Sequence, residues 1–411
     1  MSYSFILPKW QMPEHETRRS PSLDYCVRAL RTGVSYIRRF GGRDSRLRNV
    51  AFVVGLCMGL TLLGPAAFAR EYSKEVQALI IQAKAEKELN VQWSDNAFDG
   101  PRGAAAFMKG FNDYYGTNIK FNYSPGVAMT ALGMQVAEQQ QAGQPSDADV
   151  LIAGEGQVPV FYQQKILQSV NWKPLIPNLP TQYYDQAVSP DGTMVAVYST
   201  YRTIVYNTMF VSPSEAPHSL HDLLNPKWKG HVATTSYAAG FGSLTEGGWT
   251  QDQVLQYAKK LTSNLGGVMR CGEYDRLTSG EFWIFGLDCE PSRVEELIKE
   301  GAPLAQGPAM DDLQITHWCL GIPKNAQHSA VAKLFIAWML SPEGQKLVYQ
   351  YQGGDLHYLP GSQTAIIITQ IEKSTGQKFV DLTPAKLIAD FQRESQLQSQ
   401  VANIFRSASL N

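Results

Sequence analysis

Helical and strand-like hydrophobic patterns alternate along the segment 76–153, and this order constrains the fold more than any other feature. Apolar residues recur at helical spacing in three stretches, which are residues 76–83, 104–111 and 129–136. Stretches typical of strands follow them, at residues 91–93, 119–123 and 148–153. Because helix and strand alternate with short connections, the pattern predicts an α/β fold in which helices cover a parallel sheet.

The chain is long enough for two hydrophobic cores. Residues 70–411 number 342, whereas a single core stops growing at about 250–300 residues. The extended run Met194–Val211 has a polar middle, and Leu313–Ile322 is a second extended run, so both suit segments that cross between two lobes. We therefore expect the first part of lobe 1 at 70–201, lobe 2 at 202–316, and a return to lobe 1 with C-terminal helices at 317–411.

The segment Arg43–Arg70 has the features of a secretory export signal. Basic residues precede an apolar run at Val50–Leu63, and Ala67-Phe68-Ala69 supplies the small residues of a cleavage site. The apolar run is shorter than the ~20 residues of a transmembrane helix. The pattern predicts a periplasmic chain that is cleaved near Ala69.

This expected export signal, residues 1–69, has an over-long n-region. Secretory signals usually total about 15–30 residues, whereas 49 residues precede the apolar run here. A start codon assigned too far upstream would account for the extra length, and so would a twin-arginine type of signal through Arg38 and Arg39. A retained membrane anchor is a third interpretation that the sequence leaves open.

The composition after the signal narrows the functional classes. Residues 70–411 carry 26 Lys and Arg against 33 Asp and Glu, a net charge of −7. A negative net charge disfavours binding to nucleic acid. The cysteines of this part are Cys271, Cys289 and Cys319, and their spacing matches no zinc site. A disulfide between Cys271 and Cys289 and a set of buried thiols remain alternatives.

Five short motifs resemble, in order, those of one protein family. They are Ala148–Val150 (ADV), Ile204–Thr208 (IVYNT), Asp222–Gly230 (DLLNPKWKG), Ala332–Ile336 (AKLFI) and Ser341–Gln345 (SPEGQ). The set is similar to that of the bacterial extracellular solute-binding proteins of ABC importers, in the iron(III)/thiamine/polyamine-like group. The resemblance extends over about residues 75–360.

The resemblance implies a two-lobe fold of the periplasmic-binding-protein type II class, with a central cleft and hinge strands that close around a ligand. It implies a monomer, without cofactor, bound metal or catalytic residues, that captures a small solute and delivers it to an ABC permease in the inner membrane. A secreted hydrolase and a ligand-sensing protein not coupled to transport are the alternative functions. Neither a G-x-S-x-G nor an H-E-x-x-H motif occurs in the sequence.

Small and polar residues follow three of the predicted strands. In open α/β sheets, ligands bind beyond the carboxyl ends of the strands, where helix N-termini present backbone N–H groups. The residues at these places are Ser94, Asp95 and Asn96, then Ser124 and Gly126, and then Ser236 and Tyr237. We expect them to bind the ligand, and ordinary helix capping is the alternative at each place.

The first crossing segment supplies four more expected ligand contacts, which are Tyr198, Ser199, Tyr201 and Arg202. The Arg202 guanidinium suits a carboxylate or phosphate, because its planar fork binds such groups through two hydrogen bonds. A structural salt bridge between the lobes is the alternative role for Arg202. Glu155 follows the strand at 148–153, where it is expected either to face the cleft or to begin a helix.

The resemblance also bears on the identity of the ligand. Iron-binding relatives carry a Tyr–Tyr pair in lobe 2 and a histidine after the first strand. Gly280–Asp288 lacks such a pair, and Trp93–Asn96 lacks the histidine. Because Fe(III) prefers hard oxygen donors such as phenolates, we expect a small anionic or organic solute rather than iron(III).

Overall fold

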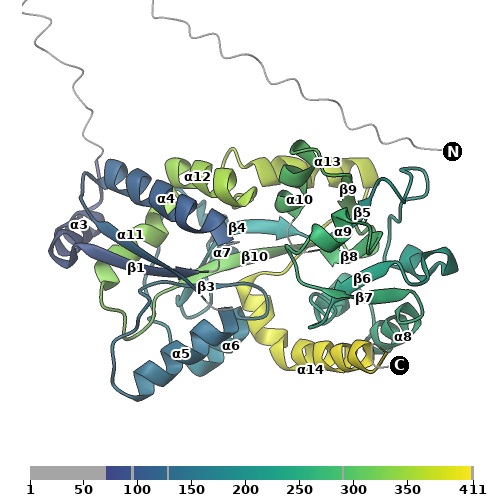
Figure 1. The fold of residues 1–411 in the computed structure, drawn as a ribbon. Coiled ribbons are helices and arrows are strands. Elements are labelled where there is room, and N and C mark those ends of the chain that lie inside the picture. The colour runs from purple at the N-terminus through teal and green to yellow at the C-terminus, as the bar shows by residue number, and fades with distance from the viewer. Residues whose placement is uncertain (1–70, 94–96, 127–128, 289–290, 409–411) are drawn as a thin grey trace, which may run out of the picture. The chain divides into compact units, whose positions relative to one another are not determined.

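The computed structural model describes residues 71–93, 97–126, 129–288 and 291–408. Residues 72–411 cluster as one compact unit (Figure 1). The expected export signal, residues 1–69, and the expected ligand residues Ser94, Asp95 and Asn96 lie outside the described residues. Among the helices of the described part, none combines the length and the apolar character that crossing a membrane requires.

The N-terminal part of lobe 1 alternates helices and strands, as the sequence predicts. In chain order it contains α3 (Lys74–Glu86), β1 (Glu88–Trp93), η1 (Ala97–Asp99), α4 (Gly100–Tyr115), β2 (Lys120–Pro125), α5 (Met129–Gln141), β3 (Leu151–Ala153), α6 (Val158–Gln164), η2 (Thr181–Tyr183) and α7 (Tyr184–Ala187). β1 and β2 pair in parallel, from Glu88 opposite Lys120 to Trp93 opposite Pro125. The carboxyl ends of both strands therefore lie at the same edge.

Lobe 2 is built on a five-stranded mixed sheet. Its elements are β5 (Thr203–Asn207), η3 (His221–Leu224), η4 (Pro226–Trp228), β6 (Val232–Thr235), η5 (Ser243–Gly247), α8 (Gln251–Leu261), β7 (Leu265–Met269), α9 (Asp275–Thr278), β8 (Ile284–Asp288), α10 (Pro291–Lys299) and β9 (Leu304–Pro308). The strand order is β7-β6-β8-β5-β9. β6 is parallel to β7 and β8, whereas β5 is antiparallel to β8 and β9. Two hydrophobic clusters of its own fill this lobe.

Two antiparallel strands, β4 (Met194–Tyr201) and β10 (Gln314–Gly321), connect the lobes. They pair from Met194 opposite Gly321 to Tyr201 opposite Ile315. Beyond Tyr201 the chain continues through Arg202 directly into β5 of lobe 2. The short strands β3 and β11 (Val380–Asp381) also pair with β10. β4 and β10 thus occupy the two segments that the sequence suggests as crossings.

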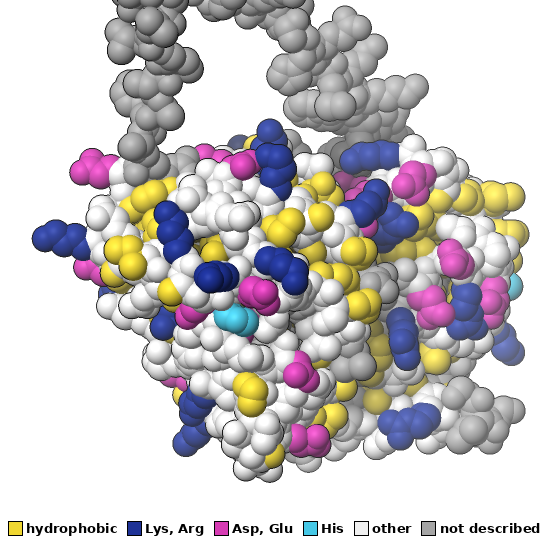
Figure 2. Space-filling model, turned by 60° about the vertical axis from the view of Figure 1, so that its left-hand side comes forward, with side chains coloured by type: hydrophobic (Ala, Val, Ile, Leu, Met, Phe, Trp, Pro, Cys, Tyr) yellow, Lys and Arg dark blue, Asp and Glu magenta, His cyan; other side chains and the backbone are white. Residues whose placement is uncertain are grey.

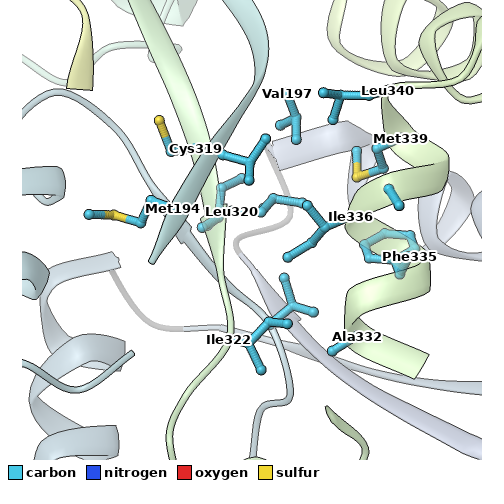
Figure 3. Packing of buried hydrophobic residues seen from close by; sticks show 14 of the residues in the cluster. Met194, Val197, Cys319, Leu320, Ile322, Ala332, Phe335, Ile336, Met339 and Leu340 are labelled. Carbon is cyan, nitrogen blue, oxygen red and sulfur yellow. The ribbon is translucent and has the colours of Figure 1, made fainter. Parts of the chain in front are cut away.

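The core of lobe 1 forms where β4 and β10 pack against α11 (Ser329–Met339). Figure 3 shows Val197 of β4 and Leu320 of β10 beside Ile336 of α11, and all three side chains are fully buried. The next helices are α12 (Pro342–Gln352) and α13 (Gln363–Thr375). α12 begins at Pro342 because the hydroxyl oxygen of Ser341 accepts a hydrogen bond from the Gly344 N–H (3.0 Å).

The C-terminal helix α14 (Pro384–Ala408) packs on both lobes. Leu387 belongs to the lobe 1 core, whereas Leu397 and Phe405 belong to a lobe 2 core. Figure 1 shows this helix running from α6 toward α8, and it contacts both. The expected return of 317–411 to lobe 1 therefore describes the chain as far as the first turns of α14. Hydrophobic spacing predicts the helix, but it does not specify which surface the helix covers.

The cysteines and the surface charges bear on two expectations. Cys271 is disulfide-bonded and Cys319 is a buried free thiol. Cys289, the expected partner of Cys271, lies outside the described residues. On the face that Figure 2 shows, basic and acidic side chains are interspersed rather than gathered in a single-sign patch. This mixture does not resemble the basic stripe of a nucleic-acid-binding surface.

Candidate ligand-binding site

Arg202 lies between β4 and β5, at the point where the chain passes from lobe 1 to lobe 2. Its side chain is only 3% exposed. Nη2 forms an ion pair with Glu155 and donates to Oγ of Ser243 (3.0 Å), while Nη1 donates to the carbonyl of Gly240 (3.1 Å) and to Oε1 of Gln314 (3.0 Å). Oγ of Ser243 in turn donates to Oε1 of Glu155 (2.8 Å). We call this set the lobe junction.

The lobe junction joins residues from both lobes and from both crossing segments. Glu155 follows β3 in lobe 1, Gly240 and Ser243 follow β6 in lobe 2, and Gln314 begins β10. Gly240 has a left-handed backbone (φ 82°), and a Cβ there would lie 2.5 Å from Cζ of Arg202. Glycine is therefore required at this position, since any side chain would displace the guanidinium.

Two further carboxyl groups surround Arg202. Oδ2 of Asp312 lies 3.6 Å from Nη1 of Arg202, and Asp312 is fully buried. Burial raises the pKa of Asp312 to about 7, against the opposing effect of Arg202. Glu394 of α14 is 9% exposed, and burial, with the nearby carboxylate of Glu155, raises its pKa to about 7. Burial acts to lower the pKa of Arg202, but Glu155 and Asp312 raise it above its ordinary value.

The four residues predicted on the first crossing segment divide between two faces of β4. Tyr198 makes ring contacts with Phe98 and with Trp318 of β10, on the face where Arg202 meets Glu155. Ser199 and Tyr201 point to the opposite face, because side chains alternate along a strand. Tyr201 contacts the ring of Phe379 there, and burial raises its pKa.

Ser199 belongs to a separate polar network behind the hinge strands. Its Oγ lies 3.2 Å from Nδ1 of His317 and 2.8 Å from Nδ1 of His357. Nε2 of His317 lies 2.7 Å from Oδ1 of Asp381, and the hydroxyl of Tyr358 donates to Oδ2 of the same carboxylate. Burial, with His317, lowers the pKa of His357 to about 4. Burial acts to raise the pKa of Asp381, but His317 lowers it below its ordinary value.

The predicted residues at the strand ends lie where the sequence suggests. Ser124 is exposed at the end of β2, and the N–H of Gly126 donates to the carbonyl of Trp93 (2.8 Å). A Cβ at Gly126 would lie 3.2 Å from the Trp93 backbone, so the chain just after β2 lies close against the last residue of β1. Ser236 and Tyr237 are exposed just after β6, and they lead into the part of the loop that reaches Arg202.

Strained backbone marks the same strand ends, and the sequence carries no sign of it. Six described residues other than glycine have positive φ, and two of them, Lys87 and Lys165, are helix C-caps. The other four follow β1 or lie at or after the ends of β6 and β8, and they are Phe98 (51°), Asp99 (57°), Ala238 (50°) and Leu287 (58°). Such conformations cost about 1–3 kcal/mol each and cluster at functional sites.

Several residues around Arg202 are not among those predicted from the sequence. Ser243 follows the G-F-G turn after β6, and its place after a strand is a signal of the kind that identified Ser236. Asp312 and Gln314 are polar residues next to an apolar crossing strand. Both features are visible in the sequence, although only the structure shows that these side chains meet Arg202.

The sequence and the fold were compared with known proteins. Residues 104–373 match the family described as "Bacterial extracellular solute-binding protein". No curated protein matches the chain. Among solved structures, the iron-bound HitA from Pseudomonas aeruginosa is similar with a TM-score of 0.60 at 18% identity, over 77% of this chain and 99% of HitA.

Two further solved structures have the same fold. The substrate-binding protein of an ABC transporter from Agrobacterium tumefaciens aligns with a TM-score of 0.63 at 14% identity, over 79% of this chain and 97% of that protein. The spermidine/putrescine substrate-binding protein PotD from Streptococcus pneumoniae aligns with a TM-score of 0.54 at 15% identity, over 79% of this chain and 99% of PotD. The predicted two-lobe periplasmic-binding-protein type II fold is confirmed. Because the family match spans well over half of the chain, the protein belongs to the bacterial extracellular solute-binding protein family.

Proposed function

We propose that this chain is the periplasmic subunit of an ABC importer that captures a small solute between its lobes, next to the lobe junction, and delivers it to a membrane permease. Proteins of its family bind small solutes and pass them to ABC permeases. The observation that carries the proposal is the meeting of Glu155 from lobe 1, Arg202 from the crossing and Ser243 from lobe 2. A solute bound beside these groups would contact both lobes at once.

The bonds of Arg202 define how an anionic solute would bind. Both Nη atoms already donate within the protein, so the guanidinium offers no open fork. Glu155 is the one ion-pair partner of Arg202 in the described part of the chain with appreciable exposure, at 24%. Its carboxylate occupies the position in which a ligand carboxylate or phosphate would bind to Arg202 and Ser243. We therefore propose that the anionic group of the solute exchanges with Glu155.

An organic or oxyanionic cargo is favoured over iron(III). The HitA structure contains iron, but Gly280–Asp288 of this chain carries no Tyr–Tyr pair. At the end of β8, the hydroxyl of Tyr274 donates to both carboxyl oxygens of Asp288 (2.8 and 2.9 Å). The phenol of Tyr274 and the carboxylate of Asp288 could both act as metal ligands, but here they are hydrogen-bonded to each other. This arrangement supports a cargo other than a hard cation.

The alternative of a secreted hydrolase receives little support from the network behind the hinge. Ser199, His317 and Asp381 have the residue types of a hydrolytic triad. However, Ser199 is 1% exposed and His317 is fully buried. A nucleophile must reach its substrate, and the hydroxyl of Ser199 is instead enclosed between two imidazole rings. The network is better suited to bracing β4 against β10.

A thermal-shift screen tests the proposed function. The purified protein would be heated with ferric citrate, thiamine phosphates, phosphonates, polyamines and sugar phosphates, because a ligand specific for the folded state raises the melting temperature. We expect an organic anion to bind and to be recovered chemically unchanged, and Glu155→Asp to change its affinity. Binding of ferric citrate alone would refute the cargo class, and a transformed compound would refute the transport function.

The location of the protein has its own test. Membership of the family implies an extracytoplasmic protein. We propose export through the N-terminal signal with cleavage near Ala69. N-terminal sequencing of the protein from a periplasmic fraction would show a chain that starts close to Arg70, whereas a chain retained in the membrane fraction with its first residues intact would support the anchored alternative.

A further inference from the structure

Three carboxyl groups from three separate chain segments surround the single guanidinium of the lobe junction. Glu155 comes from the loop after β3, Asp312 from the segment before β10, and Glu394 from α14. Arg202 interacts electrostatically with all three. The backbone of Glu394 lies against the loop after β6, since a Cβ on Gly242 would lie 2.6 Å from the Glu394 carbonyl oxygen. The single positive charge of Arg202 therefore has up to three negative charges to compensate.

Asp312 is poorly compensated. Neither of its carboxyl oxygens has a hydrogen-bond partner, and the residue is 1% exposed. Its contact with Arg202 at 3.6 Å is an ion pair without a hydrogen bond. A buried carboxylate that lacks hydrogen bonds is costly, and protonation removes most of that cost. The geometry of Asp312 therefore suits a carboxyl group that holds a proton.

Glu394 is in a similar position on α14. The charged groups that act on it besides Glu155 are Glu246 of η5 and, from its own helix, Asp390 and Arg393. Arg393 is the only cation among them, and it forms ion pairs with Glu246 and with Asp390 (3.0 Å). Besides Arg202, Glu394 thus has one neighbouring cation among the described residues, and that cation already pairs with two other carboxylates.

We propose that the lobe junction is a proton-linked latch, in which proton uptake by Asp312 and Glu394 strengthens the bridge from Arg202 to Glu155 and holds the lobes together. Loss of these protons adds two negative charges beside Glu155, which repel it from the junction. The latch rests on the proposed function, because it assumes that the lobes move together and apart. What it adds is that pH controls this movement.

The direction of the effect follows from proton linkage. The joined arrangement buries Asp312 and Glu394 next to Glu155, and burial raises the pKa of each to about 7. Separation of the lobes would move Glu155 away and admit water, which lowers both pKa values. The joined form therefore binds protons more tightly and gains population as the pH falls through 7. The ratio of joined to separated molecules changes up to about tenfold for each pKa unit involved.

Other titratable groups could imitate this behaviour, so they require a control. Asp311 also faces Asp312, but it forms an ion pair with His221 (2.7 Å) at the surface of lobe 2. His317, His357 and Asp381 lie on the opposite face of β4 and β10. His357, with its pKa of about 4, would titrate well below the range of the latch.

Single-molecule energy transfer between the lobes tests the latch. Dyes attached through unnatural amino acids at Met134 of α5 and Met209 of lobe 2 suit this purpose, because both side chains are exposed (50% and 73%). Between about pH 8.5 and about pH 5.5 we expect the ratio of joined to separated molecules to rise about tenfold or more, with the rise beginning near pH 7. Asp312→Asn and Glu394→Gln together should keep it high at every pH.

Three matched variants complete the experiment. Glu155→Gln should lower the joined population at every pH, and His357→Gln should retain the pH response of the unmodified protein. The single variants Asp312→Asn and Glu394→Gln, checked for folding by circular dichroism, cover the case in which the double variant fails to fold. A transfer efficiency that does not change with pH would overturn the latch, and so would an unchanged response in the Asp312 and Glu394 variants or its loss in His357→Gln.

Failure of the latch and failure of the proposed function are distinguishable. Solute binding would be measured by calorimetry at one pH in the unmodified protein. Binding without any pH response of the lobes would refute the latch alone. A pH response with no binder among the screened solutes would leave the latch standing and count against the proposed cargo.

Discussion

Replacement of Arg202 by alanine should destabilise the protein severely, a result that the sequence alone does not predict because it leaves open a ligand contact or a structural salt bridge. The substitution deletes the hydrogen bonds to Gly240, Ser243 and Gln314 and both ion pairs. It also leaves Asp312 fully buried without a counter-ion. Removing one partner of a buried ion pair costs about 3–5 kcal/mol, and we expect a loss in that range from the free energy of unfolding at pH 7.5.

The assay is chemical denaturation, with a surface ion pair of the same lobe as the control. Arg276 pairs with Glu281 (2.5 Å) while the two side chains are 36% and 50% exposed. Such exposed pairs contribute about 0–1 kcal/mol, so Arg276→Ala should lower the free energy of unfolding by no more than that. Adding Asp312→Asn to Arg202→Ala should recover part of the loss, because it removes the uncompensated charge.

Two outcomes of these denaturation measurements would contradict the prediction. If Arg202→Ala costs less than about 1 kcal/mol, as the exposed control does, then the junction contributes no more than a surface pair. If Asp312→Asn recovers nothing in the Arg202→Ala background, the loss comes from hydrogen bonding and packing rather than from a buried charge. Either result would also remove the electrostatic basis for placing the bound solute at Arg202.

Three further predictions concern single positions. Asp312→Asn alone should raise the free energy of unfolding at pH 8 by up to about 4 kcal/mol and should change it little at pH 4. The pKa of Asp312 is about 7 in the folded protein against an ordinary value of 3.8, so its ionised form destabilises the fold at high pH and this cost disappears as the pH falls. Denaturation curves at the two pH values check it, and an equal effect at both would contradict it. Gly240→Ala should displace the Arg202 guanidinium and cost at least about 2 kcal/mol, which a melting curve measures; an unchanged melting temperature would mean that the loop relaxes freely. Phe335→Ala should cost about 3–5 kcal/mol, because Phe335 is fully buried in the lobe 1 core, and a smaller loss in urea denaturation would show that this core collapses around the cavity.

The sequence predicts the fold class and the positions of polar residues at the strand ends, because both depend on local patterns. Alternating helical and extended periodicity predicts the α/β lobes, and short polar segments mark the carboxyl ends of β2 and β6. Arg202 ends the first crossing segment in the sequence, and in the structure it lies between β4 and β5. These features need no knowledge of distant partners.

Pairing between distant residues could not be predicted in the same way. Tyr198 contacts Phe98 and Trp318 on one face of β4, whereas Ser199 points to His317 on the other face. Strand alternation implies this division, but the sequence does not tell which face meets the lobe junction. The left-handed backbone at Ala238 (φ 50°) likewise has no local signature, since alanine rarely adopts it and only the surrounding structure maintains it.

The separation of the cores explains why electrostatics at the junction should govern the movement of the lobes. The lobe 1 cluster and the lobe 2 clusters are distinct, so parting the lobes exposes little of either core. The exception is α14, which contributes Leu387 to one core and Leu397 to the other.

Because both ends of α14 are anchored, the lobes can part only as far as this helix can tilt. Glu394 lies between Leu387 and Leu397 on this helix, so a tilt of the helix would move its carboxyl group relative to the lobe junction. Parting of the lobes within this limit would separate Glu155 from Asp312 and Glu394, which is why the protonation of these two carboxyl groups should shift the equilibrium between joined and separated lobes.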